Sequence, residues 1–112
     1  MSKSAAILVG HILESISDIE SFLEGVQKEQ FLASKEKQAA VIRTLEVIGE
    51  AVKGLPAEFT QNHPGIPWRD IAGMRDNLIH EYFAVDLEEV WKTITKDLPE
   101  LKTQLLAMPM NR

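Results

Sequence analysis

Residues 8–26, with the sequence LVGHILESISDIESFLEGV, decide the fold class of this chain. Apolar side chains recur there at steps of three and four residues, the spacing that places them on one face of an α-helix. We therefore expect an amphipathic helix over residues 4–25, ended by Gly25 and the polar residues that follow it. The positions that define its apolar face are Leu8, Ile12, Ile16, Ile19, Leu23 and Val26.

A second helix is expected to begin near Ser34, since a serine before an apolar stripe is a favourable N-cap. Gly54 and Pro56 stop this helix, because glycine suits a helix end and proline cannot continue one. Residues 56–61 can then form a short helical turn. The apolar stripe of the second helix consists of Val41, Leu45, Ile48, Val52 and Leu55.

Two further helices follow the clearest loop, NHPGIP at residues 62–67, where two prolines and a glycine break regular hydrogen bonding. Pro67 is expected in the first turn of the third helix. Asp86, with Glu89 three residues later, resembles a capping box and starts the fourth helix. Pro99 is expected to allow a short last helix or a kink.

No segment shows the alternation of a β-strand, so the predicted fold is all-α, an antiparallel bundle of four to five helices. The 112 residues suffice for one domain with a hydrophobic core. We assign residues 1–107 to this single helical domain and residues 108–112 to a flexible C-terminal tail. The longest apolar run, residues 5–9, is far too short to cross a membrane, and no signal peptide is evident. We therefore expect a cytoplasmic protein with no membrane partner.

Composition narrows the chemistry that the chain can perform. The absence of cysteine excludes disulfides and thiolate metal sites. The formal net charge is −5, with acids and bases interspersed, which argues against a broad electrostatic grip on nucleic acid. Glu46 and Glu50 lie one helical turn apart but have no histidine at a metal-ligand spacing. We expect neither a metal site nor a cofactor.

The stretch MRDNLIHEYF, residues 74–83, carries the candidate catalytic groups. Arg75 supplies a permanent cation that can bind a phosphate through two N–H groups at once. His80 supplies an imidazole that exchanges a proton near neutral pH. This pair is what metal-free cleavage of a phosphodiester needs. Asp76 can orient either side chain or face solvent, and Tyr82 lies close enough to influence the same site.

The spacing of the pair poses a geometric problem. His80 lies five residues beyond Arg75, or about 140° away around an ideal helix, so a straight helix does not aim both at one substrate. The helix is distorted, the long arginine reaches around it, or a second chain completes the site. In a two-fold dimer identical helices meet and the motif appears twice, and the small Gly73 lets backbones approach closely.

The pattern R-x4-H-x-Y, read as Arg75, His80 and Tyr82, resembles the signature of the HEPN (higher eukaryote and prokaryote nucleotide-binding) superfamily. The chain is most similar to the HepT-like branch of ribonuclease toxins. The resemblance extends over residues 8–105 through AAVIRTLEVIGEAVKGLP, NHPGIPWRDIAGMRDNLIHEYFAVDLEEVW and DLPELK. One departure is Thr44, where the family pattern leads us to expect asparagine.

The resemblance implies an all-helical homodimer that cleaves RNA, without metal, in a cleft between the two chains. Arg75 and His80 match the catalytic positions, and Asp76 matches the supporting polar residue after the arginine. Tyr82 matches the tyrosine that a cognate minimal nucleotidyltransferase, the antitoxin, modifies with AMP. A higher assembly with that antitoxin is a further possibility.

Two other functions fit the same sequence. The first is a catalytically inactive helical module that docks a nucleotidyltransferase or a nucleotide, which the negative net charge favours. The second is a purely structural helical dimer. In those cases Arg75 forms a salt bridge, His80 is a hydrogen-bonded structural histidine, and Tyr82 packs in the core with its hydroxyl at the rim. The intact motif argues against the second function more than against the first.

Overall fold

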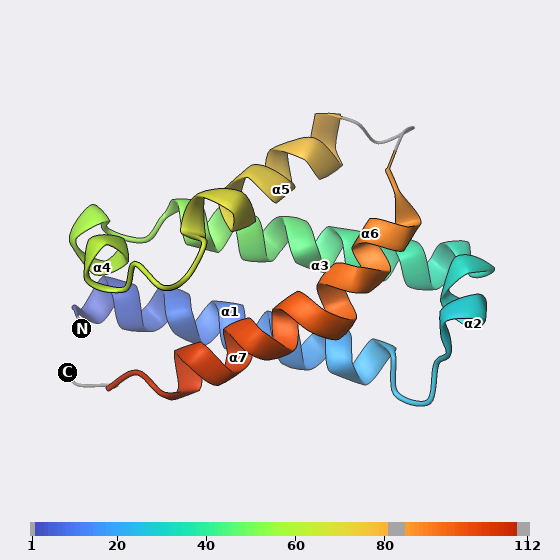
Figure 1. The fold of residues 1–112 in the computed structure, drawn as a ribbon, viewed down its shortest axis with the longest axis horizontal. Coiled ribbons are helices and arrows are strands. Elements are labelled where there is room, and N and C mark those ends of the chain that lie inside the picture. Colours follow the sequence, from blue (N-terminus) through green and yellow to red (C-terminus); the bar gives the residue numbers. More distant parts are fainter. Residues whose placement is uncertain (1, 81–84, 110–112) are drawn as a thin grey trace.

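The computed structural model describes residues 2–80 and 85–109, and of Ile79 and His80 it describes the backbone. Within these ranges the chain is helical and contains no strand, so the predicted all-α class is confirmed (Figure 1). The helices are α1 (Lys3–Phe22), α2 (Lys28–Leu32), α3 (Lys35–Lys53), α4 (Ala57–Asn62), α5 (Trp68–His80), α6 (Leu87–Lys92) and α7 (Leu98–Leu106), and a π-helical segment, Thr93–Asp97, joins the last two.

The long helices form the bundle. Figure 1 shows α1 and α3 running in opposite directions, with α5 on the far side of α3 from α1. The segment from α6 to α7 runs across them, and it brings α6 to α2 and α7 to α1. Among the described helices, none is both long and apolar enough to cross a membrane. Because α3 contacts both α1 and α5, it connects α5 to the rest of the bundle and fixes the position of side chains on α5.

Local capping explains where the first two long helices begin. The Ser2 hydroxyl accepts a hydrogen bond from the Ala5 N–H at 3.2 Å, which starts α1. The Ser34 hydroxyl accepts one from the Lys37 N–H at 3.2 Å, which confirms the predicted start of α3. The first helix stops at Phe22, earlier than expected. Gly25 then takes a φ of 73°, a left-handed conformation that glycine adopts without strain.

The short helix α2 was not predicted. It is held by the Gln38 side-chain amide, which donates 3.0 Å hydrogen bonds to the carbonyls of Phe31 and Leu32. Phe31 is fully buried, with its ring centroid 5.4 Å from that of Trp91. A five-residue helix is too short to show helical periodicity, so only these tertiary contacts identify it.

The helices α5 and α6 begin close to where the sequence predicts them. The Trp68 indole N–H donates to the carbonyl of His63 at 2.9 Å, which ties the loop to the start of α5. Pro67 lies directly before α5, not in its first turn as predicted, and its carbonyl accepts from the Ile71 N–H at 3.1 Å. The Asp86 carboxylate accepts from the Glu89 N–H at 3.3 Å, so the N-cap predicted for the fourth helix is confirmed.

Pro99 explains the π-helical segment. Because proline has no N–H, it cannot donate to the carbonyl of Thr95 four residues earlier, and the helix widens at Thr93–Asp97 before α7 begins. Beyond α7 the core continues to Met108, which is 9% exposed. The buried core thus reaches one residue into the segment expected to be a flexible tail, and residues 110–112 of that segment lie outside the described residues.

Candidate functional site

Arg75 lies in the middle of α5, where that helix crosses α3 at Gly49. A Cβ atom added to Gly49 would overlap the Cβ of Arg75, and it would lie 3.3 Å from both the Cα and the Cγ of Arg75. Real Cβ atoms do not approach neighbours so closely, so the crossing requires glycine at this position. The close approach sets the base of the arginine side chain firmly against α3.

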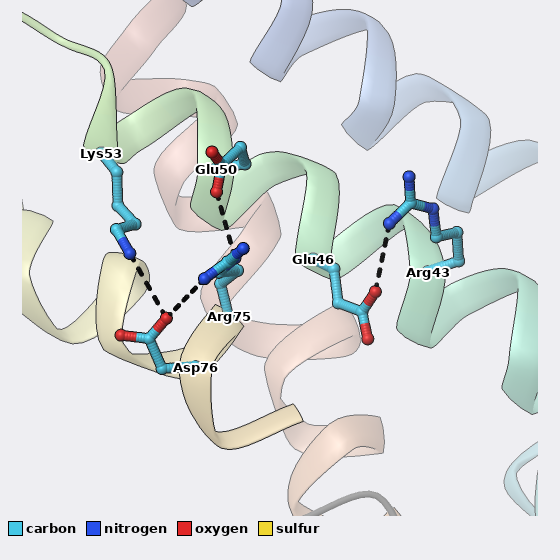
Figure 2. A network of polar contacts seen from close by, with 6 residues as sticks. All are labelled: Arg43, Glu46, Glu50, Lys53, Arg75 and Asp76. Carbon is cyan, nitrogen blue, oxygen red and sulfur yellow. Dashed lines mark hydrogen bonds and ion pairs between the residues drawn. The ribbon is translucent and has the colours of Figure 1, made fainter. Parts of the chain in front are cut away.

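Two carboxylates hold the guanidinium of Arg75, as Figure 2 shows. Its Nε lies 3.0 Å from Oε2 of Glu50, which projects from α3. Its Nη1 donates to Oδ1 of Asp76, the next residue along α5, at 2.9 Å. Lys53, one turn beyond Glu50 on α3, reaches the same Asp76 oxygen at 3.4 Å. The network therefore joins both helices through alternating charges.

The contacts shift the ionisation of both partners in favour of their charged forms. The hydrogen bond from Arg75, followed by that from Lys53, lowers the pKa of Asp76 below its ordinary value. The hydrogen bond to Asp76 and the nearby charge of Glu50 raise the pKa of Arg75 further. Asp76 is therefore a carboxylate and Arg75 a cation throughout the physiological range. The sequence left open whether Asp76 orients Arg75, orients His80 or faces solvent. In the structure its carboxylate accepts from Arg75, and 46% of its side chain is exposed.

A groove opens beside Arg75, between α1, α3 and α5. It has a volume of about 540 Å³ and both apolar and ionisable side chains on its walls. Arg75 lines this groove from α5, and 29% of its side chain is exposed. The ionisable residues that line the groove are His11, Glu14, Arg43, Glu46, Glu50 and Arg75.

Gly73 and Asn77 lie on the other side of α5. They line a second groove, with Asp86 and Glu89 on its far wall. At about 100° of rotation per residue, Gly73 and Asn77 are expected on a different face of the helix from Arg75, and the structure places them there. Within the described chain, open space surrounds Gly73, since nothing lies within 4 Å of an added Cβ.

The remaining predicted site residues lie at or beyond the end of α5. His80 is the last residue of α5, on the same helix as Arg75 and Asp76. Its side chain lies outside the described residues, and so does the whole of Tyr82. The structure thus brings together Arg75 and Asp76 of the predicted set.

The sequence did not single out the residues of α3 that hold Arg75. The spacing of Glu46 and Glu50 with Arg43 fits either a charged helix face or a polar contact across the bundle, and Glu50 makes a contact of the second kind, with Arg75 of α5. Arg43, 74% exposed, pairs with Glu46 instead at 3.3 Å. One signal was available: Gly49 interrupts a helix interior at a cost of about 1 kcal/mol relative to alanine, which indicates a close contact there.

Thr44 departs from the expected asparagine without disturbing this network. Its hydroxyl donates to the carbonyl of Ala40, one turn earlier on α3, at 2.8 Å. The hydroxyl is therefore satisfied within its own helix. The departure leaves the contacts of Arg75 in place.

Comparison with known proteins gives consistent relatives. Residues 12–108 match the family model described as "Ribonuclease HepT-like". The chain is 49% identical over 102 residues to "Probable ribonuclease HepT" of Thermococcus cleftensis, covering 91% of this chain and 93% of that protein. It is 46% identical over 95 residues to "Putative RNase TTE0752" of Caldanaerobacter subterraneus, covering 85% of each.

A longer relative contains a similar sequence within a larger protein. The chain is 47% identical over 106 residues to "Gamma-glutamylcyclotransferase and putative RNase MJ0434" of Methanocaldococcus jannaschii. That match covers 95% of this chain but 48% of the relative, so the chain spans about half of its length. No solved structure matches the chain.

Proposed function

The chain belongs to the HepT-like ribonuclease family, and from this premise we propose that it is a metal-independent endoribonuclease in which Arg75 and His80 act on RNA. The observation that supports the proposal most strongly is the fixed guanidinium of Arg75. It stands at the wall of a groove, on the helix that ends with His80. We place the enzyme in the cytoplasm, as a single helical domain whose core extends to Met108.

Arg75 suits a phosphate group for a stereochemical reason. A guanidinium has five N–H donors in one plane; Nη1 donates one of them to Asp76, and Nε forms an ion pair with Glu50 at 3.0 Å. The remaining donors can approach the non-bridging oxygens of a phosphate. A cation that is already fixed in place stabilises the negative charge that develops there without first having to reorganise.

The reaction begins with the 2′-hydroxyl of RNA. As His80 removes its proton, the 2′-oxygen forms a bond to the adjacent phosphorus, and the bond from phosphorus to the 5′-oxygen breaks. The leaving oxygen takes up a proton from an imidazolium. The products are a 2′,3′-cyclic phosphate and a 5′-hydroxyl. General acid–base help of this kind contributes about 10²–10⁴-fold to the rate.

We propose further that a homodimer completes the site. The backbone of α5 is α-helical from Trp68 to His80, so the two catalytic positions stay on different faces of one helix. A two-fold axis beside this helix would bring Arg75 of one chain toward His80 of the other. His80 of that composite site then removes the proton of the 2′-hydroxyl, and its imidazolium returns a proton to the leaving oxygen.

The same family premise suggests regulation by a toxin–antitoxin partner. We propose that a minimal nucleotidyltransferase acts as the antitoxin. The phenol oxygen of Tyr82 attacks the α-phosphorus of ATP, pyrophosphate leaves, and AMP remains on the tyrosine after its proton is lost. A bulky anion two residues from His80 would repel the RNA backbone by like charge.

A second candidate function has support of its own. Glu14, Glu46 and Glu50 line the groove beside Arg75, and the net charge is −5, so the surface is poorly suited to RNA alone. These features favour a helical module that docks a nucleotidyltransferase or a nucleotide without cutting RNA. This alternative predicts that the protein binds a nucleotidyltransferase or a nucleotide and does not cleave RNA.

A ribonuclease assay in EDTA separates the two functions. The unmodified protein should cleave RNA, a 2′-deoxy substrate should resist because the nucleophile is missing, and Arg75→Ala should lose activity. The matched control is Arg69→Ala. Arg69 is an exposed arginine on α5, and it lines the second groove, together with Gly73 and Asn77. Cleavage by the Arg75→Ala variant at the wild-type rate would contradict the proposed role of this residue.

A further inference from the structure

Glu50 contacts Arg75 from a different helix, and this distinguishes it from Asp76. Asp76 follows Arg75 on α5, so the contact between them travels with that helix. Glu50 belongs to α3, and its contact with Nε at 3.0 Å fixes the guanidinium relative to the rest of the bundle (Figure 2). Of the two carboxylates, Glu50 is therefore the one that contacts the guanidinium directly from α3.

We infer that Glu50 is a positioning residue of the proposed ribonuclease: it holds Arg75 by Nε so that the outer guanidinium donors face the scissile phosphate. The inference rests on the proposed function and adds a residue to it. Glu50 acts through Arg75 and need not contact RNA.

The surroundings of Glu50 support this role over a role in stability. Glu50 is preceded by Gly49, which lets α5 approach closely enough for the contact. Its side chain is 63% exposed, so little of its surface is buried by packing. An exposed ion pair contributes at most about 1 kcal/mol to folding, which leaves orientation of Arg75 as the main consequence of the contact.

The geometry leaves room for a phosphate beside the carboxylates. Nε lies 3.0 Å from a carboxylate oxygen of Glu50, with which it forms an ion pair. Within the described part of the chain, Nη2 of Arg75 has no hydrogen-bond partner. Lys53 lies beside Asp76 and offsets the negative charge that an approaching phosphate would meet there. The carboxylates and the phosphate can therefore bind different edges of one guanidinium.

The test compares three Glu50 variants in steady-state RNA cleavage. Glu50→Ala removes the acceptor, so kcat should fall about 10–100-fold while KM changes little, as when a supporting contact to a reacting group is lost. Glu50→Gln keeps the size of the side chain but removes the charge that pairs with the guanidinium, so its kcat should fall as well. Glu50→Asp keeps the charge but is one methylene shorter, so kcat should fall with the fold intact. Glu36→Ala, an exposed glutamate in the first turn of α3, is the matched control and should behave like wild type.

A second measurement follows the contact itself. The NMR chemical shift of Arg75 Nε should move in both Glu50→Ala and Glu50→Gln, because the carboxylate charge 3.0 Å from Nε is then missing. A Glu50→Ala variant that cleaves at the wild-type rate, or faster, would overturn the inference while the proposed ribonuclease stands. A wild-type protein that cleaves no RNA would overturn the proposed function, and the role of Glu50 with it.

Discussion

The backbone of Gly49 lies directly against the side chain of Arg75, and this contact determines how closely α3 and α5 pack. The next residue on α3, Glu50, is thereby brought within 3.0 Å of Nε of Arg75. A glycine that weakens its own helix thus permits the ion pair that orients the candidate catalytic cation. The packing of the bundle and the chemistry of the site depend on the same pair of residues.

Replacing Gly49 with alanine should separate the two helices. The added methyl group overlaps the Cβ of Arg75, so we expect a loss of about 1–3 kcal/mol in the free energy of unfolding, together with weaker RNA cleavage. Gly10→Ala, in the interior of α1 with nothing within 4 Å of its added Cβ, is the control and should stabilise the fold by about 0.5–1 kcal/mol. Urea denaturation measures both changes, and a Gly49→Ala variant as stable as Gly10→Ala would contradict the close crossing.

Asp76 should make stability depend on pH in the acid range. Its pKa in the folded protein lies below the ordinary value of 3.8, so its carboxylate stabilises the fold above about pH 4 and loses that effect as pH falls through the lowered pKa. Wild type should be more stable than Asp76→Asn at pH 7, and the difference should shrink below pH 4. Because the ion pairs are exposed, we expect a modest difference.

Thermal melts of both proteins between about pH 2 and 7 measure this difference. In a Lys53→Met background it should be smaller, since one of the two cations that lower the Asp76 pKa is then missing. A constant difference across the whole pH range would show that Asp76 is not held as described.

The long elements of this fold could be predicted because their apolar spacing and caps are local. Ser34 and Asp86 begin their helices as the sequence indicated, and the predicted stripe of the second long helix, α3, is buried throughout. On α1 the prediction is partly correct: Ile12, Ile16 and Ile19 are buried, whereas Leu8 is half-buried and its neighbour Val9 is fully buried. The short helix α2 escaped prediction because its evidence lies in contacts of Phe31 with residues far away in the sequence.

The site was partly predictable for a similar reason. Arg75 and Asp76 are adjacent in sequence, so their contact could be anticipated. Glu50 and Lys53 lie on another helix, and which of the acidic residues on α3 faces Arg75 depends on where the two helices cross. The glycine at position 49 marks that crossing, but sequence spacing alone does not show which helix crosses there.

Modification of Tyr82 gives a prediction for the regulatory partner. Incubation with a cognate minimal nucleotidyltransferase and ATP should raise the intact mass of the chain by one AMP moiety and should abolish RNA cleavage, because the added group obstructs the site next to His80. Peptide mapping should place the group on Tyr82, and Tyr82→Phe should stay unmodified. An unchanged mass, or a group that maps to another residue, would reject this regulation.

Mixing two inactive variants tests the shared site most directly. Arg75→Ala and His80→Ala should each fail to cleave RNA in EDTA. After subunit exchange, a mixed dimer contains one site with Arg75 from one chain and His80 from the other, so the mixture should regain cleavage. A mixture that stays inactive after exchange has been verified by native mass spectrometry, or a His80→Ala protein that cleaves RNA by itself, would contradict the account.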